Sequence, residues 1–265
     1  MAGGTRRRAE LGQHFLAGGW LAAELVEQAG LGAGDLVVEI GAGTGVLTEA
    51  LARRAGRVVA VECDPRLADR TRARLASYAN LRVVTADALT LHVPRRPFRV
   101  VANLPFGATA AMLRRLLGDP RSRLERADLI LQEQAARRYA AVRPGSPETI
   151  RWGTVYELTT GRRLGPGCFR PPPRVAAAVL VARRRRPPLV PVAAHRRFTD
   201  LLQTAFRHPG LPLRRGLVPP LTYRQLRRLA ADLGFPLDAR PCDLDAAQWA
   251  EVFAFLDRGS PGNRR

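Results

Sequence analysis

Residues 35–45 read Asp-Leu-Val-Val-Glu-Ile-Gly-Ala-Gly-Thr-Gly, and a helical pattern follows from Val46 to Arg53. The apolar run up to Ile40 predicts a buried strand that turns directly into this helix. Glycines at such a turn let the backbone approach a ligand closely, and the start of the helix offers free N–H groups. A dinucleotide fingerprint, GxGxxG, would need a glycine where Val46 stands. The GxGxG spacing, with Glu39 two residues before Gly41, instead favours S-adenosylmethionine (SAM), which has no pyrophosphate but carries cationic groups that acids attract.

Strand and helix signals alternate along the chain around this turn. Further strands are predicted at 57–61, 81–85, 98–102 and 127–131, and helices at 18–29, 66–78 and 108–117. This alternation is typical of a parallel sheet covered by helices on both faces, so we predict an α/β fold with a Rossmann-like sheet. Two later strand signals, at 155–160 and 175–181, flank a loop rich in glycine, proline and arginine.

The composition changes at 183–188, which reads Arg-Arg-Arg-Arg-Pro-Pro and predicts a linker. Only helical patterns follow it, near 194–207, 222–233 and 245–257. We therefore expect three parts: a flexible basic arm at 1–9, a SAM-binding catalytic domain at 10–186, and a small all-helical domain at 187–265.

Two acids follow neighbouring strands of the predicted sheet. Glu62 ends the strand at 57–61, where a carboxylate in a doubly wound fold can take both hydroxyls of a ribose. Asp87 comes just after the strand at 81–85 and is placed to accept a hydrogen bond from an adenine amino group, although taken alone it is better explained as a helix cap. Because the carboxyl ends of parallel strands share one edge of a sheet, we predict a cofactor site there formed by Gly41, Gly43, Gly45, Glu62 and Asp87.

The tetrapeptide Asn103-Leu104-Pro105-Phe106 follows the strand at 98–102 and is the predicted catalytic element. The amide oxygen of Asn103 can accept a hydrogen bond from the exocyclic N–H of an amino-purine, and the carbonyl of Leu104 can accept a second. Pro105 restricts φ and so holds this shape, while Phe106 offers a flat surface for stacking on the base. The plainer reading is a strand-to-helix turn with a core phenylalanine. The neighbouring glycine loop and acids favour the amino-purine site.

The chain is strongly basic, with 43 basic residues, all of them arginine, against 23 acids and a net charge of +20. The excess is concentrated between residues 162 and 228, which hold 16 arginines and a single acid, Asp200. A charge this uneven favours a polyanionic partner, most simply a nucleic acid, because arginine binds phosphate oxygens in pairs and stacks on bases. A solvated basic face is the plainer alternative.

Other classes of protein are disfavoured by the sequence. The four histidines lack metal-ligand spacing, and the three cysteines are far apart, so we expect neither a metal site nor a disulfide: Cys63, Cys168 and Cys242. The longest uninterrupted apolar run, at 175–182, is too short to span a bilayer. Polar residues such as Glu10 interrupt any signal-peptide pattern near the N-terminus. We expect a cytoplasmic protein with no membrane partner, acting as a monomer.

Several motifs recur in a recognisable order and spacing. They are Gly12-Gln13-His14-Phe15-Leu16, the glycine loop, Glu62, Asp87, Asn103-Leu104-Pro105-Phe106 and Phe169-Arg170-Pro171-Pro172-Pro173-Arg174-Val175. Together they resemble the rRNA adenine-N6 methyltransferases, the family that contains the KsgA and Erm enzymes. The resemblance covers about residues 8–255. It implies a SAM-dependent methyltransferase sheet with an antiparallel strand late in it, followed by a helical domain that binds RNA.

The resemblance also implies roles for single residues. It implies SAM contacts at His14, Leu16, Gly41, Glu62, Asp87 and Asn103. Phe169 would be a second aromatic ring that stacks on the target base with Phe106, although a core phenylalanine before a proline turn is an equal alternative. The family often has asparagine where His14 stands and tyrosine where Phe106 stands. Stacking survives the second change, whereas any role of a phenolic hydroxyl is excluded.

Within the family, the chain looks more like Erm, which methylates 23S rRNA at the macrolide site and gives macrolide–lincosamide–streptogramin B resistance. Segment 107–115 lacks the Asn-Ile-Ser usual in KsgA, and segment 204–210 lacks its Gln-Arg-Arg-Lys run. Segments 198–206 and 249–253 look more like Erm proteins of GC-rich bacteria. The resemblance therefore implies N6-methylation of an adenine in 23S rRNA. The alternatives are a KsgA-type 16S rRNA dimethyltransferase, a DNA adenine-N6 methyltransferase, and a non-catalytic RNA-binding ribosome-assembly factor.

Overall fold

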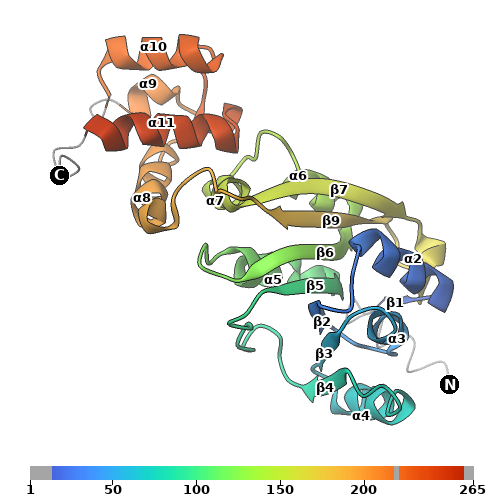
Figure 1. Cartoon of the computed structure of the whole chain (residues 1–265). Helices are drawn as coiled ribbons and strands as arrows, with labels where there is room; N and C mark the ends of the chain where they lie inside the picture. The colour runs from blue at the N-terminus through green and yellow to red at the C-terminus, as the bar shows by residue number, and fades with distance from the viewer. Residues whose placement is uncertain (1–13, 218–220, 260–265) are drawn as a thin grey trace. The chain divides into compact units, whose positions relative to one another are not determined.

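The computed structural model describes residues 14–217 and 221–259 (Figure 1). The predicted arm at 1–9 and the Gly12-Gln13 part of the first motif lie outside the described residues. The chain divides into two compact units. The first consists of Met1–Arg137 with Thr159–Arg183, and the second of Arg138–Leu158 with Arg184–Arg265.

The first unit is built on a seven-stranded sheet with the strand order β4-β3-β2-β5-β6-β9-β7. Its strands are β2 (Leu36–Ile40), β3 (Arg57–Glu62), β4 (Leu81–Thr85), β5 (Phe98–Asn103), β6 (Leu124–Gln132), β7 (Tyr156–Leu164) and β9 (Ala177–Arg184). The strands from β4 to β6 pair in parallel, whereas β9 runs antiparallel to β6. The predicted Rossmann-like sheet with a late antiparallel strand is therefore confirmed.

α2 (Gly19–Ala29) precedes the sheet, and four helices follow its strands along the chain: α3 (Val46–Ala52), α4 (Pro65–Arg74), α5 (Thr109–Leu117) and α6 (Glu133–Tyr139). All five residues of β2 are buried, as a parallel strand covered on both faces requires. Apolar side chains of α2 and α3 pack with those of β2, β5 and β9 in one core cluster. α4 starts where the Asp64 carboxylate caps the N–H of Arg66 at 2.9 Å, with Pro65 in the first position, and it ends before the predicted Tyr78.

A short two-stranded ladder joins two motifs that are far apart in the sequence. β1 (Phe15–Leu16) pairs antiparallel with β8 (Phe169–Arg170), placing Phe15 opposite Arg170 and Leu16 opposite Phe169. The N–H of Ala17 extends the ladder by donating to the carbonyl of Cys168 at 2.8 Å. This ladder holds the segment after His14 against the Phe169–Val175 motif.

The second unit is helical, with a core formed around Phe198, Leu202 and Trp249. Its helices are α7 (Pro147–Val155), α8 (His195–Ala205), α9 (Leu213–Gly216), α10 (Tyr223–Leu233) and α11 (Ala246–Gly259). Four 3-10 turns complete the described elements of the chain: η1 (Phe106–Ala108), η2 (Pro166–Cys168), η3 (Val192–Ala194) and η4 (Pro241–Asp243). The predicted all-helical composition after the sheet is confirmed, with α8, α10 and α11 close to their expected ranges.

The boundary between the units differs from the predicted domains. Residues 138–158, expected within the first domain, belong to the second unit, because Ile150 of α7 packs in the helical core. The arginine run at 183–188 is also not a free linker. β9 continues through Arg184, and the N–H of Arg185 donates to the carbonyl of Val155 at 2.8 Å.

Candidate functional site

A groove lies at the carboxyl ends of β2, β3 and β5, where the sequence motifs converge. Its lining comes from the first motif, the glycine loop, the end of β3 and the tetrapeptide: His14, Phe15, Gly41, Glu62, Cys63, Asn103, Leu104, Pro105 and Phe106. A smaller hollow beside it shares Phe15, Gly41 and Asn103 and adds Glu39 and Leu16 to the lining. The structure thus gathers most of the predicted site residues at one edge of the sheet.

The three glycines of the loop differ in what surrounds them. All three have positive φ, at 79° for Gly41, 54° for Gly43 and 77° for Gly45, a conformation that other residues rarely adopt. A Cβ on Gly43 would lie 2.6 Å from the ring of Phe15, and one on Gly45 would lie 2.9 Å from Cγ2 of Thr71. Only Gly41 lines the groove. Packing against Phe15 and α4 already requires glycine at positions 43 and 45, and the contact of these two residues with the cofactor stays a prediction.

Glu62 ties the glycine loop to the end of β3. Its Oε2 accepts the N–H of Gly43 at 2.7 Å, and its Oε1 accepts the N–H of Asp64 at 3.0 Å. The residue is buried but lines the groove. A carboxylate offers about four acceptor positions, so two backbone bonds leave capacity for the hydroxyls of a ribose.

Glu39 is a site residue that the sequence prediction did not include in its own right. Its side chain is 1% exposed, and within the described structure its Oε2 has no hydrogen-bond partner. Burial raises the pKa of Glu39 to about 8, and the charge of Glu62 adds to the shift, while the nearby Thr48 hydroxyl opposes it. A buried acid with an unused oxygen beside a groove is suited to receive a positive charge. The signal in the sequence was its position two residues before Gly41.

Asn103 is oriented by the backbone of the first motif. Its side-chain nitrogen donates to the carbonyl of His14 at 2.6 Å. Because a carbonyl can only accept, this contact assigns the amide nitrogen to that side and leaves Oδ1 on the other side as an acceptor. The N–H of Leu104 donates to the carbonyl of Ile130 at 3.2 Å, and Pro105 has a φ of −57°. The tetrapeptide is thus held by contacts at both of its first two residues.

His14 and Phe106 form one wall of the groove. Nδ1 of His14 lies 2.8 Å from the carbonyl of Pro171, so Nδ1 carries the proton and Nε2 is left as an acceptor in the neutral ring. The two rings are tilted by 38°, with centroids 5.5 Å apart. Because Nδ1 is engaged with the Pro171 carbonyl, Nε2 is the ring nitrogen that could take the place of the asparagine side chain common in the family.

Three other predicted site residues do not line the groove itself. Phe169 has no exposed surface and packs in the core of the first unit, because its pairing with Leu16 turns its side chain inward. In this conformation its ring has no free face for a base, contrary to the predicted stacking. Asp87 is exposed and its Oδ1 accepts the N–H of Leu89 at 2.9 Å in a turn, and because no helix follows it there, it is not the helix cap of the alternative reading. Leu16 is buried and reaches only the smaller hollow.

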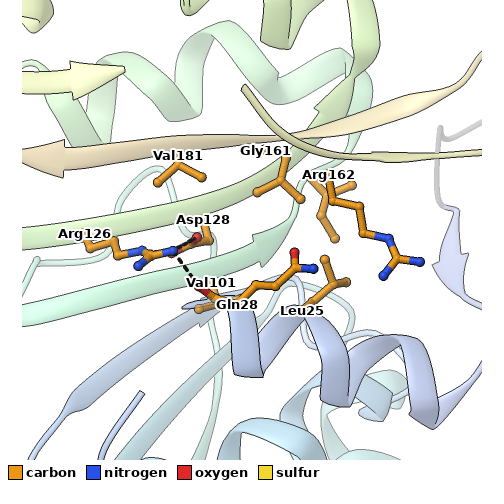
Figure 2. Close-up of a pocket in the computed structure, with 10 residues that line it drawn as sticks. Leu25, Gln28, Val101, Arg126, Asp128, Gly161, Arg162 and Val181 are labelled. Atoms are coloured by element: carbon orange, nitrogen blue, oxygen red, sulfur yellow. Dashed lines mark hydrogen bonds and ion pairs between the residues drawn. The ribbon is translucent and has the colours of Figure 1, made fainter. Parts of the chain in front are cut away.

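A second cavity, of about 190 Å³, lies between α2 and the sheet (Figure 2). Its walls are mostly apolar, including Leu25, Val101 and Val181. Figure 2 shows Arg126 directed at Asp128, with two bonds of 2.7 Å between them. These two charges satisfy each other, and no predicted site residue lines the cavity.

The groove fits SAM by the chemistry of its residues. Gly41 leaves space for close approach, Glu62 offers acceptors for a ribose, and the unpartnered Glu39 oxygen can receive a cationic group. No cluster of three or more metal-ligating side chains occurs in the described parts of the chain. In the same residues, no helix is long and apolar enough to cross a membrane.

Comparisons with known proteins agree with this geometry. Residues 4–258 match the family described as ribosomal RNA adenine dimethylase. An rRNA adenine N-6-methyltransferase of Bacillus licheniformis is 30% identical over 242 residues, which are 91% of this chain and 84% of that protein. Ribosomal RNA small subunit methyltransferase A of Prochlorococcus marinus is 34% identical over 273 residues, 96% of each chain. The crystal structure of the 23S rRNA methyltransferase ErmE is 31% identical with a TM-score of 0.83, covering 92% of this chain and 99% of that one.

Proposed function

Because the chain belongs to the ribosomal RNA adenine dimethylase family, we propose that it methylates N6 of one adenine in 23S rRNA at the macrolide-binding region and so confers antibiotic resistance. The chain is a SAM-dependent rRNA adenine-N6 methyltransferase. The choice of 23S rRNA is supported by the similarity to ErmE, which extends over 99% of that chain. The Erm-like segments at 198–206 and 249–253 support the same choice.

The cofactor would be held at the edge of the sheet by Gly41, Glu62, Glu39 and the His14–Leu16 segment. When bound, SAM supplies a methyl group on a positively charged sulfonium, which makes that carbon electrophilic. The carboxylate of Glu62 would place negative potential beside this charge, and Glu39 would add to it by losing its proton when the cation binds, which favours SAM over uncharged analogues.

The tetrapeptide would orient the adenine. Oδ1 of Asn103 and the carbonyl of Leu104 can accept the two N–H bonds of N6, which turns the nitrogen lone pair out of conjugation with the ring. Phe106 would stack on the base, an interaction worth roughly 1–3 kcal/mol. These residues act by position, so proximity and orientation supply most of the acceleration, and the proton released from N6 can pass to water.

The adenine would have to leave its stack to reach this groove. An enzyme that modifies a base takes the nucleotide out of the helix or acts on an unpaired one. The basic surface of the chain would hold the surrounding RNA by its phosphates. With Phe169 in the core, Phe106 carries the aromatic contact with the base.

Primer extension on ribosomal RNA tests the proposed substrate. Total 23S and 16S rRNA would be isolated from cells with and without the protein, and reverse-transcription stops mapped on both. We expect a new stop at an adenine of the macrolide region of 23S rRNA and resistance to macrolides in the same cells. A stop only in 16S rRNA would refute the proposal.

A second candidate function is adenine dimethylation in 16S rRNA. It is supported by the small-subunit methyltransferase A of Prochlorococcus marinus, which aligns with 96% of this chain. The same primer-extension experiment separates the two functions, because the stops fall in different rRNA molecules.

A further inference from the structure

Helix α10, labelled in Figure 1, belongs to the second unit. One of its faces is buried and the other is exposed. A capping box fixes its start: the Thr222 hydroxyl accepts the N–H of Gln225 at 3.3 Å, and the Gln225 side chain accepts the N–H of Thr222 at 2.9 Å. Leucines and an alanine bury the inner face in the helical core: Leu226, Leu229 and Ala230. The exposed residues of the helix are Tyr223, Arg224, Gln225, Arg227, Arg228, Ala231 and Asp232, three of them arginines and one an acid.

The exposed face carries positive charge with little compensation. Between Asp200 and Asp232 the sequence has six arginines and no acid. Arg228 approaches Asp232 at 3.7 Å, but both side chains are largely exposed, so this pair stabilises the helix little. Within the described chain, no acid pairs with Arg224 or Arg227. Arginines four residues apart on a helix repel each other, and a polyanion relieves that repulsion.

Tyr223 distinguishes this face from an ordinary solvated surface. Its side chain is 56% exposed although it begins the helix beside the arginines. Single-stranded RNA is held by guanidinium groups on its phosphates and by aromatic rings on its bases. Tyr223 and Arg227 are one helical turn apart, so both kinds of contact are offered on the same side of α10.

We propose that the exposed face of α10 is an rRNA-contact surface, in which Arg224 and Arg227 bind phosphates and Tyr223 stacks on an unpaired base. The proposal rests on the rRNA methyltransferase function and adds to it the helix of the second unit that holds the substrate. Phosphate contacts supply affinity and its salt dependence, whereas stacking supplies affinity with little salt dependence.

Equilibrium binding to a 23S rRNA transcript, measured from about 50 to about 200 mM salt, tests this surface. The double variant Arg224→Gln/Arg227→Gln should bind at least about tenfold more weakly and lower the slope of log K against log salt by about 1.5. Tyr223→Ala should weaken binding by roughly 5- to 150-fold without changing the slope, and Tyr223→Phe should bind nearly as the wild type does. Arg258→Gln in α11 removes one arginine from the same unit, half the charge change of the double variant, and should keep the wild-type slope.

The outcomes separate this proposal from the choice of 23S rRNA. The same titration on a 16S transcript shows whether the surface acts on whichever rRNA is bound. Helical circular dichroism and the unfolding midpoint check that each variant is folded. One outcome is that methylation maps to 16S rRNA while the double variant still lowers the slope of log K against log salt on the 16S transcript. In that case the 23S assignment is wrong and the proposed α10 surface is supported. If the double variant keeps the wild-type slope on both transcripts, or Tyr223→Phe binds as weakly as Tyr223→Ala, the proposed surface is wrong.

Discussion

Replacing Glu39 by glutamine should make the fold of the first unit more stable at neutral pH. Burial raises the pKa of Glu39 from 4.5 to about 8, so the folded protein keeps a proton that the unfolded chain releases above pH 4.5. Unfolding in this range therefore releases a proton, and the free energy of unfolding falls as the pH rises, until Glu39 ionises in the folded state near pH 8. Glutamine has a similar shape and does not titrate, so Glu39→Gln removes this loss.

The size of the effect follows from the shift. Each pH unit between the two pKa values changes the free energy of unfolding by about 1.4 kcal/mol, so at about pH 7 the wild type has lost on the order of 3 kcal/mol. The other titrating groups are common to both proteins and cancel in the difference between them. Glu39→Gln should therefore be close to the wild type near pH 4.5 and gain on it steadily up to neutral pH.

Urea unfolding of both proteins at about pH 5 and about pH 7 measures this difference. The free energy of unfolding of Glu39→Gln minus that of the wild type should rise by about 2.5 kcal/mol between the two conditions. Parallel pH dependences for the two proteins would show that Glu39 is ionised in the folded state. The reasoning about its burial and its unused oxygen would then be wrong.

Three further substitutions test the groove. Gly43→Ala places a Cβ 2.6 Å from the Phe15 ring and strains a positive φ, so we expect at least about tenfold weaker SAM binding by calorimetry. An undiminished affinity for SAM would count against the packing role of Gly43. Phe106→Ala should raise KM for rRNA by roughly 5- to 150-fold in methyl-transfer assays, whereas Phe106→Tyr should keep the wild-type value; equal values for the two variants would exclude stacking. Phe169→Ala leaves a cavity at a fully buried site and should lower the free energy of unfolding by about 3–5 kcal/mol in urea titrations. Wild-type stability with a raised KM for rRNA would instead indicate that Phe169 stacks on the target base.

The sheet could be predicted because its local signals agree with its tertiary environment. The run from Leu36 to Ile40 is apolar at four of five positions, as a strand buried on both faces must be, and the glycines after it mark the turn. The convergence of Glu62 and Asn103 follows from the shared edge of parallel strands. These parts of the site can be predicted from the parallel pairing of the strands alone, and the alternation of helices and strands indicates that pairing.

Other features depend on long-range contacts that the sequence does not display. Phe169 is turned into the core by its pairing with Leu16, over 150 residues earlier, and nothing local distinguishes that from exposure at the groove. The protonation of Glu39 likewise depends on burial by several elements. α7 is a different case, because Ser146 and Pro147 form a recognisable helix start that the sequence prediction overlooked.

Transfer of labelled methyl groups from SAM to purified RNA and DNA tests the central claim most directly. Wild-type protein and Asn103→Ala would be incubated with 23S rRNA, 16S rRNA and duplex DNA, and the digested nucleosides analysed, with unfolding midpoints confirming that the variant is folded. We predict label as N6-methylated adenosine in 23S rRNA alone, and a loss of at least about a hundredfold in the variant. Label in 16S rRNA or DNA in place of 23S rRNA, or full activity of Asn103→Ala, would contradict the account.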